Sequence, residues 1–185
     1  MEFVCISDWD ELPESANALF AEGEKDSIFF SRAWFNNLVN TALEDDQTLL
    51  IACVIEGDRM LAILPIMKRS SEKWYSLRNI YTSLYSLLLA DNDKQAILTC
   101  LAQGLGQLPL ESLQLRPVAE DDKNINCLQR VMELNDFDCY RHFQFYNWIH
   151  RVQGKSFKDY MAARPSRLRN TIARKQRKLE REHGY

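Results

Sequence analysis

The sequence TLLIACVIEGDRMLAILPIM, from Thr48 to Met67, predicts the central hairpin of a β-sheet. Residues 48–55 are almost all apolar, as in a buried strand. The segment EGDR at 56–59 is typical of a turn, and an equally apolar segment returns from Met60. Pro65 lies in this second strand, which indicates an edge position or a bulge at that point.

Strand and helix patterns alternate on both sides of the hairpin. We expect strands over residues 3–6, 74–80, 83–89, 110–116 and 137–149, the last of them long and rich in aromatic residues. A first helix should carry Leu12, Ala16 and Leu19 and end near Gly23. One further helix should begin after Asp93 and another should span 124–134. Two final helices should cover 157–163 and 166–182. This order predicts an α/β fold, with a mixed, mostly antiparallel central sheet, helices on both faces and a C-terminal basic helix.

A helix is also expected after Ser31, which has the side chain of a good N-cap. Helical spacing places Trp34, Phe35 and Leu38 on one face of it. We expect this face to lie in the core, Trp34 included, although Trp34 is also a candidate for a substrate cleft.

The composition indicates a globular chain with a packed core, since 46% of its residues are hydrophobic and 11% aromatic. Its five cysteines are scattered and form no CxxC pair, which favours a reducing, cytoplasmic setting over a disulfide framework or a zinc site. No apolar run reaches membrane-spanning length. His142 and His150, on the expected long strand, would lie about 26 Å apart, too far to share a metal ion.

The charge is distributed unevenly along the chain. The whole chain has a formal charge of −3, whereas the residues from Arg151 onward hold eleven Lys/Arg and three Asp/Glu, a balance of +8. Residues 1–150 therefore carry −11. A thin apolar stripe of Leu168, Ile172 and Leu179 crosses the last, basic helix, which could be a solvated helix, a phosphate-binding surface or a helix that packs on further structure.

The stretch LAQGLGQ, residues 101–107, is a candidate phosphate-binding loop because of its two glycines. Gly104 and Gly106 match the glycines of an acyl-CoA loop, but Leu101 stands where such a loop has Arg or Gln. The stretch also falls at the end of a predicted helix, where free N–H groups are absent. We therefore interpret it as a helix C-terminus.

Several motifs resemble one family. They are FFSRAWFNNL at 29–38, AILPIMKR at 62–69, LQLRP at 113–117 and the segment from Phe157 through the RKLE at 177–180. Together they resemble the CelD-like and Fem-type branch of the GNAT acyltransferases, whose members use two tandem GNAT-like domains. Tyr85 matches an aromatic position of that family, whereas Leu84 and Leu87 replace its acidic ones.

The resemblance implies a GNAT-like N-terminal domain over 1–153 and the opening helices of a second, truncated domain over 154–185. It implies transfer of an acyl group from CoA or an aminoacyl-tRNA to the amine or hydroxyl of a small envelope or polysaccharide precursor. Acyl-CoA would be a co-substrate and not a tightly bound cofactor, and the donor site would lie largely in the second domain. The residues alone assign no catalytic base, no cofactor-binding residue and no metal ligand.

The candidate substrate-binding residues are Trp34, Tyr85 and Arg116, where Arg116 follows a strand and could hold a carboxylate or phosphate. Two other functions stay open: a non-catalytic GNAT-like module for binding or dimerisation, and RNA binding through the basic tail. The C-terminal helix would then pack in a homodimer or on the rest of a second domain.

Overall fold

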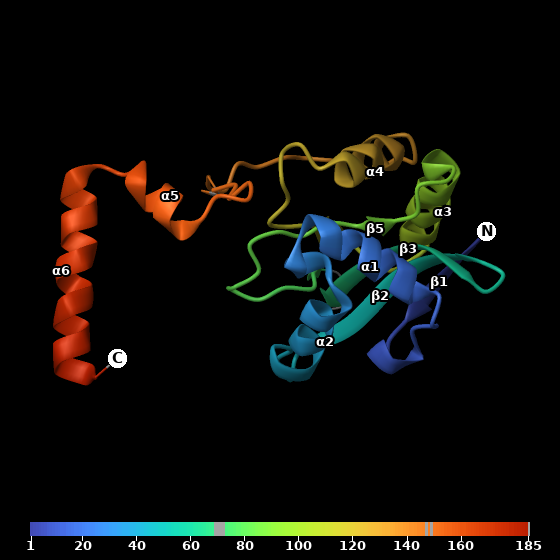
Figure 1. The fold of residues 1–185 in the computed structure, drawn as a ribbon. Helices are drawn as coiled ribbons and strands as arrows, with labels where there is room; N and C mark the ends of the chain where they lie inside the picture. The colour runs from blue at the N-terminus through green and yellow to red at the C-terminus, as the bar shows by residue number, and fades with distance from the viewer. Residues whose placement is uncertain (69–72, 147, 149, 185) are drawn as a thin grey trace. The chain divides into compact units, whose positions relative to one another are not determined.

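The computed structural model describes residues 1–68, 73–146, 148 and 150–184, which form two compact units. Unit 1 is Met1–Phe145 and unit 2 is Tyr146–Tyr185 (Figure 1). The predicted domain boundary at 153/154 stays a prediction. Because residues 146–150 hold no Lys, Arg, Asp or Glu, unit 1 carries the charge of −11 and unit 2 that of +8.

Unit 1 is built on one open sheet, which confirms the α/β class with a mixed, mostly antiparallel sheet. Strands run in the order β1 (Glu2–Ile6), β2 (Thr48–Glu56), β3 (Arg59–Lys68), β4 (Lys73–Ser76) and β6 (Ser112–Gln114), and β5 (Leu88–Leu89) also pairs with β3. Every pairing is antiparallel except that of β4 with β6. The parallel pair gives this edge of the sheet two strand ends that point the same way.

The expected hairpin is present, with its turn at Gly57, whose φ is +58°. The expectation for Pro65 was wrong: the register shift lies between Val54 and Ile55, and Pro65 pairs with Ile51 in the middle of the hairpin. On the other side of β3, β5 pairs with residues 62–63 and β4 with 66–68. Pro65 falls in the gap between them, so the N–H that proline lacks is not needed there.

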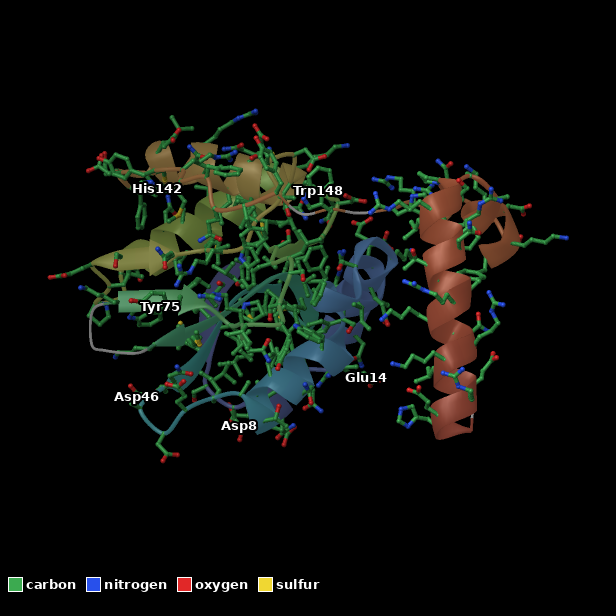
Figure 2. All side chains as sticks on the ribbon, turned by 90° about the vertical axis from the view of Figure 1, so that its left-hand side faces the viewer. Asp8, Glu14, Asp46, Tyr75, His142 and Trp148 are labelled. Carbon is green, nitrogen blue, oxygen red and sulfur yellow. The ribbon has the colours of Figure 1, made fainter. Side chains whose placement is uncertain are left out.

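Helices cover both faces of the sheet. Phe3 packs so closely under Gly104 of α3 (Lys94–Gly106) that a Cβ there would lie 2.0 Å from the ring, and Leu88 packs likewise against Gly23 of α1 (Ala16–Asp26). Strand pairing puts Phe3 on the same face as Leu89, hence opposite to Leu88. In Figure 2 the sheet lies between α1 with α2 (Arg32–Thr41) and α3 with α4 (Lys123–Glu133).

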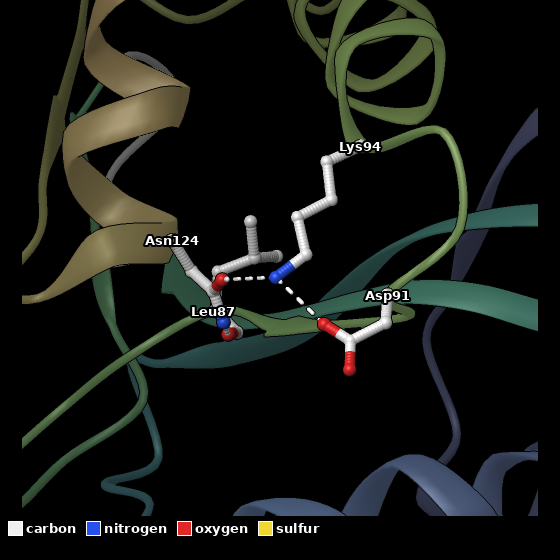
Figure 3. A network of polar contacts seen from close by, with 4 residues as sticks. All are labelled: Leu87, Asp91, Lys94 and Asn124. Atoms are coloured by element: carbon white, nitrogen blue, oxygen red, sulfur yellow. Dashed lines mark hydrogen bonds and ion pairs between the residues drawn. The ribbon is translucent and has the colours of Figure 1, made fainter.

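A polar network joins the starts of α3 and α4 to β5 (Figure 3). The Lys94 ammonium lies 2.9 Å from a carboxylate oxygen of Asp91 and donates to the Asn124 side-chain oxygen at 3.5 Å. The Asn124 amide in turn donates to the carbonyl of Leu87 at 3.2 Å. The network therefore links the start of α4 to the residues on either side of β5, 30 to 37 positions earlier in the sequence.

Most predicted helices are confirmed. Ser31 caps α2 by accepting from the Trp34 N–H at 3.1 Å, and Asp93 caps α3. The first helix differs, because it is split into a short turn η1 (Trp9–Glu11) and α1, and α1 continues past Gly23. A second short turn, η2 (Ile28–Phe30), precedes α2.

Four strand predictions were wrong in part or entirely. The strands expected over 74–80 and 110–116 shorten to β4 and β6, and that over 83–89 to the two residues of β5. The long strand over 137–149 is absent from its described residues; Asn147 and Ile149 lie outside them. Alternating aromatic residues favour a strand, but a strand also needs a neighbour for its backbone groups, and none of the described strands pairs with this segment.

The described residues of unit 2 form an irregular segment, α5 (Phe157–Ala162) and α6 (Ser166–His183). Ser156 and Asp159 form a capping box at the start of α5. None of the described residues of α6 is buried, and the stripe residues Leu168, Ile172 and Leu179 are 44%, 38% and 47% exposed. Across the described residues of both units, no helix has the length and apolar character needed to cross a membrane.

Candidate anion-binding site

Two arginines lie at one edge of the sheet, just beyond the ends of the parallel strands. Trp74 pairs with Leu113 across β4 and β6, so the carboxyl ends of the two strands meet. Arg78 and Arg116 each follow the last residue of their strand by two positions. In open sheets the carboxyl ends of parallel strands are the usual position of ligand sites.

The two guanidinium groups are close enough to repel each other. Burial and, second, the charge of Arg116 lower the pKa of Arg78. Both side chains are half-buried, and the Nε of each is shielded from solvent without a hydrogen-bond partner among the described residues. No carboxylate of the described residues forms an ion pair with either arginine. The pair therefore has donors and positive charge that an anion would satisfy.

The backbone that carries Arg116 is fixed by buried neighbours. The Ser76 hydroxyl donates to the Arg116 carbonyl at 2.6 Å, and the Ser76 hydroxyl oxygen accepts from the Arg116 N–H at 3.2 Å. The Tyr85 N–H donates to the carbonyl of Pro117 at 2.7 Å. Ser76 and Tyr85 are both fully buried. Arg116 thus starts from a rigid support, which lowers the entropy cost of holding a ligand.

The Tyr85 side chain is part of the core. Its hydroxyl donates to the carbonyl of Pro65 at 2.6 Å, and its ring meets that of Phe35 edge-on, with centroids 6.5 Å apart. Burial raises the pKa of the Tyr85 hydroxyl well above its ordinary value. These contacts show that the Tyr85 side chain packs in the core and supports the backbone next to Arg116. Direct substrate binding by its side chain stays a prediction.

Trp34 lies on α2 and is half-buried, with its ring edge-on to Phe29 at 4.8 Å. Its indole N–H is shielded from solvent and has no hydrogen-bond partner among the described residues. Over the same residues, no hydrogen bond or ring contact joins Trp34 to Arg116. The structure therefore brings Arg116 together with Arg78 and with the backbone of Tyr85. A role of Trp34 in substrate binding stays a prediction.

Sequence reasoning named Arg116 but missed Arg78. Both arginines follow strands, yet neighbouring strands in sequence suggest antiparallel hairpins, in which the two ends would point in opposite directions. The parallel pairing of β4 with β6, across a long connection that contains β5 and α3, is what places the two arginines together. No short-range sequence pattern gives that pairing.

The other sequence candidates are placed elsewhere. The stretch at 101–107 ends α3, as expected, and Gly104 is packed on Phe3 instead of facing a ligand. His142 and His150 do not share a strand, so the argument from their spacing does not hold; they belong to different units. Among the described residues no group of His, Cys, Asp and Glu could hold a metal ion.

Comparison of the chain with protein-family models, with curated proteins and with solved structures found no match.

Proposed function

We propose that this chain supplies the acceptor-binding part of an acyltransferase of GNAT-like fold. The observation that carries the proposal is the pair Arg78 and Arg116, which lack an anionic partner among the described residues, at the carboxyl ends of β4 and β6. The sequence resemblance adds the reaction class. In this proposal the arginines hold an anionic group of the acceptor, so that its amine or hydroxyl is oriented for attack.

The proposed reaction is an acyl transfer. The acceptor nitrogen or oxygen forms a bond to the carbonyl carbon of the acyl group, and the bond from that carbon to the carrier breaks. The proton lost by the acceptor ends on the leaving group, which is the thiol of CoA or the ribose hydroxyl of an aminoacyl-tRNA. The arginines contribute positioning, because their charge acts on a part of the acceptor that does not react.

Mass spectrometry tests the reaction class directly. The protein encoded by the complete gene is incubated with acetyl-CoA or aminoacyl-tRNA and with pooled amine- and hydroxyl-bearing envelope or polysaccharide precursors. We expect a product heavier by one acyl group and a matching amount of free carrier. Hydrolysis of the donor without any acylated product would contradict an acyltransferase.

A second function is favoured by a separate observation on unit 2. At about 100° per residue, one arc of α6 of about 100° holds five cations and no acidic residue. These cations are Arg167, Arg174, Arg177, Lys178 and Arg181. The stripe of Leu168, Ile172 and Leu179 lies on the other side, so it could pack on protein while the arc contacts the phosphates of an RNA.

Fluorescence anisotropy with a labelled single-stranded RNA tests this alternative. Replacing Arg167 and Arg174 together by Gln should weaken RNA binding and reduce its dependence on salt. The variant with Arg169 and Lys175 both replaced by Gln, outside the arc, is the matched control with the same change of charge. Equal affinity of the Arg167 and Arg174 variant and the control would exclude this arc as an RNA site.

A further inference from the structure

We propose that Arg78 and Arg116 form a two-arginine site for a dianionic phosphate group, the phosphate of the acyl acceptor. The identity of the ligand as an acceptor rests on the proposed function, whereas the phosphate site itself rests on the geometry of the two arginines. Arg116 lies in the LQLRP segment of the family resemblance, whereas Arg78 belongs to none of its motifs.

The charge of the site favours a dianion over a carboxylate. Two guanidinium groups that repel each other carry +2 between them, and burial strengthens the repulsion by removing water. One carboxylate would neutralise only one of them. A phosphate monoester, whose second pKa is about 6, carries nearly two negative charges at pH 8 and has three oxygens for the two planar groups.

The donors available match the same ligand. The Nε of Arg78 and the Nε of Arg116 are both withdrawn from solvent and have no described acceptor. Arginine presents Nε–H and a terminal N–H as a parallel pair that fits two phosphate oxygens. Because both Nε atoms are closed to solvent in this structure, a phosphate that takes one such pair on each arginine requires the two side chains to rotate.

The negative charge of unit 1 allows phosphate binding at a specific site to be distinguished from nonspecific electrostatic attraction. Unit 1 has a charge of −11 and repels anions as a whole, and Figure 2 shows Asp8, Glu14 and Asp46 on its outside. Binding of phosphate to such a body must therefore come from a local arrangement of cations. The hydrogen bonds of Ser76 and Tyr85 to the backbone around Arg116 hold one half of that arrangement in place.

The phosphate binding is tested on the 185-residue chain by calorimetry with inorganic phosphate at pH 8, with acetate as the carboxylate probe. We expect saturable binding of phosphate and much weaker binding of acetate. Arg78→Met and Arg116→Met should each weaken phosphate binding roughly tenfold to hundredfold. Arg59→Met, at the exposed first residue of β3, is the matched control and should bind as the unmodified chain does.

A thermal melt separates loss of the site from loss of the fold. Without phosphate, Arg78→Met should melt at the same or a higher temperature than the unmodified chain, because the repulsion by Arg116 is gone. Phosphate should raise the melting temperature of the unmodified chain and of Arg59→Met but not that of Arg78→Met. An equal rise in all three chains would overturn the proposal.

Two further probes separate the acceptor from the donor as the source of the phosphate. Glycerol 3-phosphate represents a phosphorylated acceptor, and CoA represents the donor. We expect glycerol 3-phosphate to compete with inorganic phosphate, and CoA to bind no better than inorganic phosphate does. CoA binding that is much tighter and depends on Arg116 would assign the site to the donor and overturn the acceptor part.

The outcomes distinguish this inference from the proposed function. Phosphate binding together with an absence of acyl transfer would refute the reaction class and leave the two-arginine site standing. Acetate binding tighter than phosphate binding would refute the dianion and leave an acyltransferase with a carboxylate-bearing acceptor.

Discussion

Replacement of Phe35 by Ala should be among the most destabilising single changes in unit 1. Phe35 is 1% exposed on the buried face of α2. Its ring lies 6.1 Å from that of Trp9, 6.2 Å from that of Phe20 and 6.5 Å from that of Tyr85, all measured between centroids. The substitution therefore opens a cavity among three aromatic rings.

The cost follows from the ring that is lost. A buried Phe→Ala change removes about 3–5 kcal/mol from the free energy of unfolding, and the three ring contacts favour the upper half of that range. With a urea m-value of about 2 kcal/mol per M, the unfolding midpoint should fall by roughly 2 M.

Urea unfolding is followed by tryptophan fluorescence, to which Trp9 beside Phe35 contributes, and by circular dichroism. Tyr81→Ala is the control, because Tyr81 is 72% exposed and its removal should change the free energy by less than about 0.5 kcal/mol. An unchanged midpoint for Phe35→Ala would place this face of α2 in solvent and refute the packing described for unit 1.

Two other substitutions test the support of the site and the contact between α3 and β1. Tyr85→Phe should cost only about 1 kcal/mol, because the carbonyl of Pro65 keeps its bond from the Leu77 N–H at 3.0 Å. Burial raises the pKa of the Tyr85 hydroxyl, so above about pH 10 the tyrosine ionises in the unfolded chain first and the free energy of unfolding falls as the pH rises. Tyr85→Phe should reduce this alkaline loss of stability. Identical pH profiles of the two chains above pH 10 would contradict the burial of Tyr85. Gly104→Ala should lower the melting temperature by several degrees, because its Cβ would lie 2.0 Å from the Phe3 ring, and the double variant with Phe3→Ala should recover part of the loss. A Gly104→Ala chain as stable as the original would show that α3 does not pack on β1 in this way.

Local signals gave much of the fold from the sequence. The hairpin at 48–67, the Ser31 cap and the start of α6 at Ser166 all follow from patterns within a few residues. Predictions failed where distant packing decides the structure. α1 continues through Gly23 because that glycine lets Leu88 and Phe30 approach, and the described residues of the aromatic segment after Phe137 form no strand because they pair with no described strand.

The site was predictable only in part, for the same reason. Arg116 stands out because it follows an apolar strand, whereas Arg78 gains meaning only through the parallel pairing of β4 and β6. Tyr85 is a candidate from the sequence only through its place in a family motif. Its measurable role in the structure is to fill the core and hold the backbone next to Arg116.

The central claim is that this arginine pair binds the acceptor and not the donor, and steady-state kinetics of Arg116→Met test it most directly. In the protein encoded by the complete gene, we expect a KM for the acceptor raised roughly tenfold to hundredfold, with the KM for the acyl donor within about twofold of the original. A raised KM for the donor, with that for the acceptor unchanged, would contradict it.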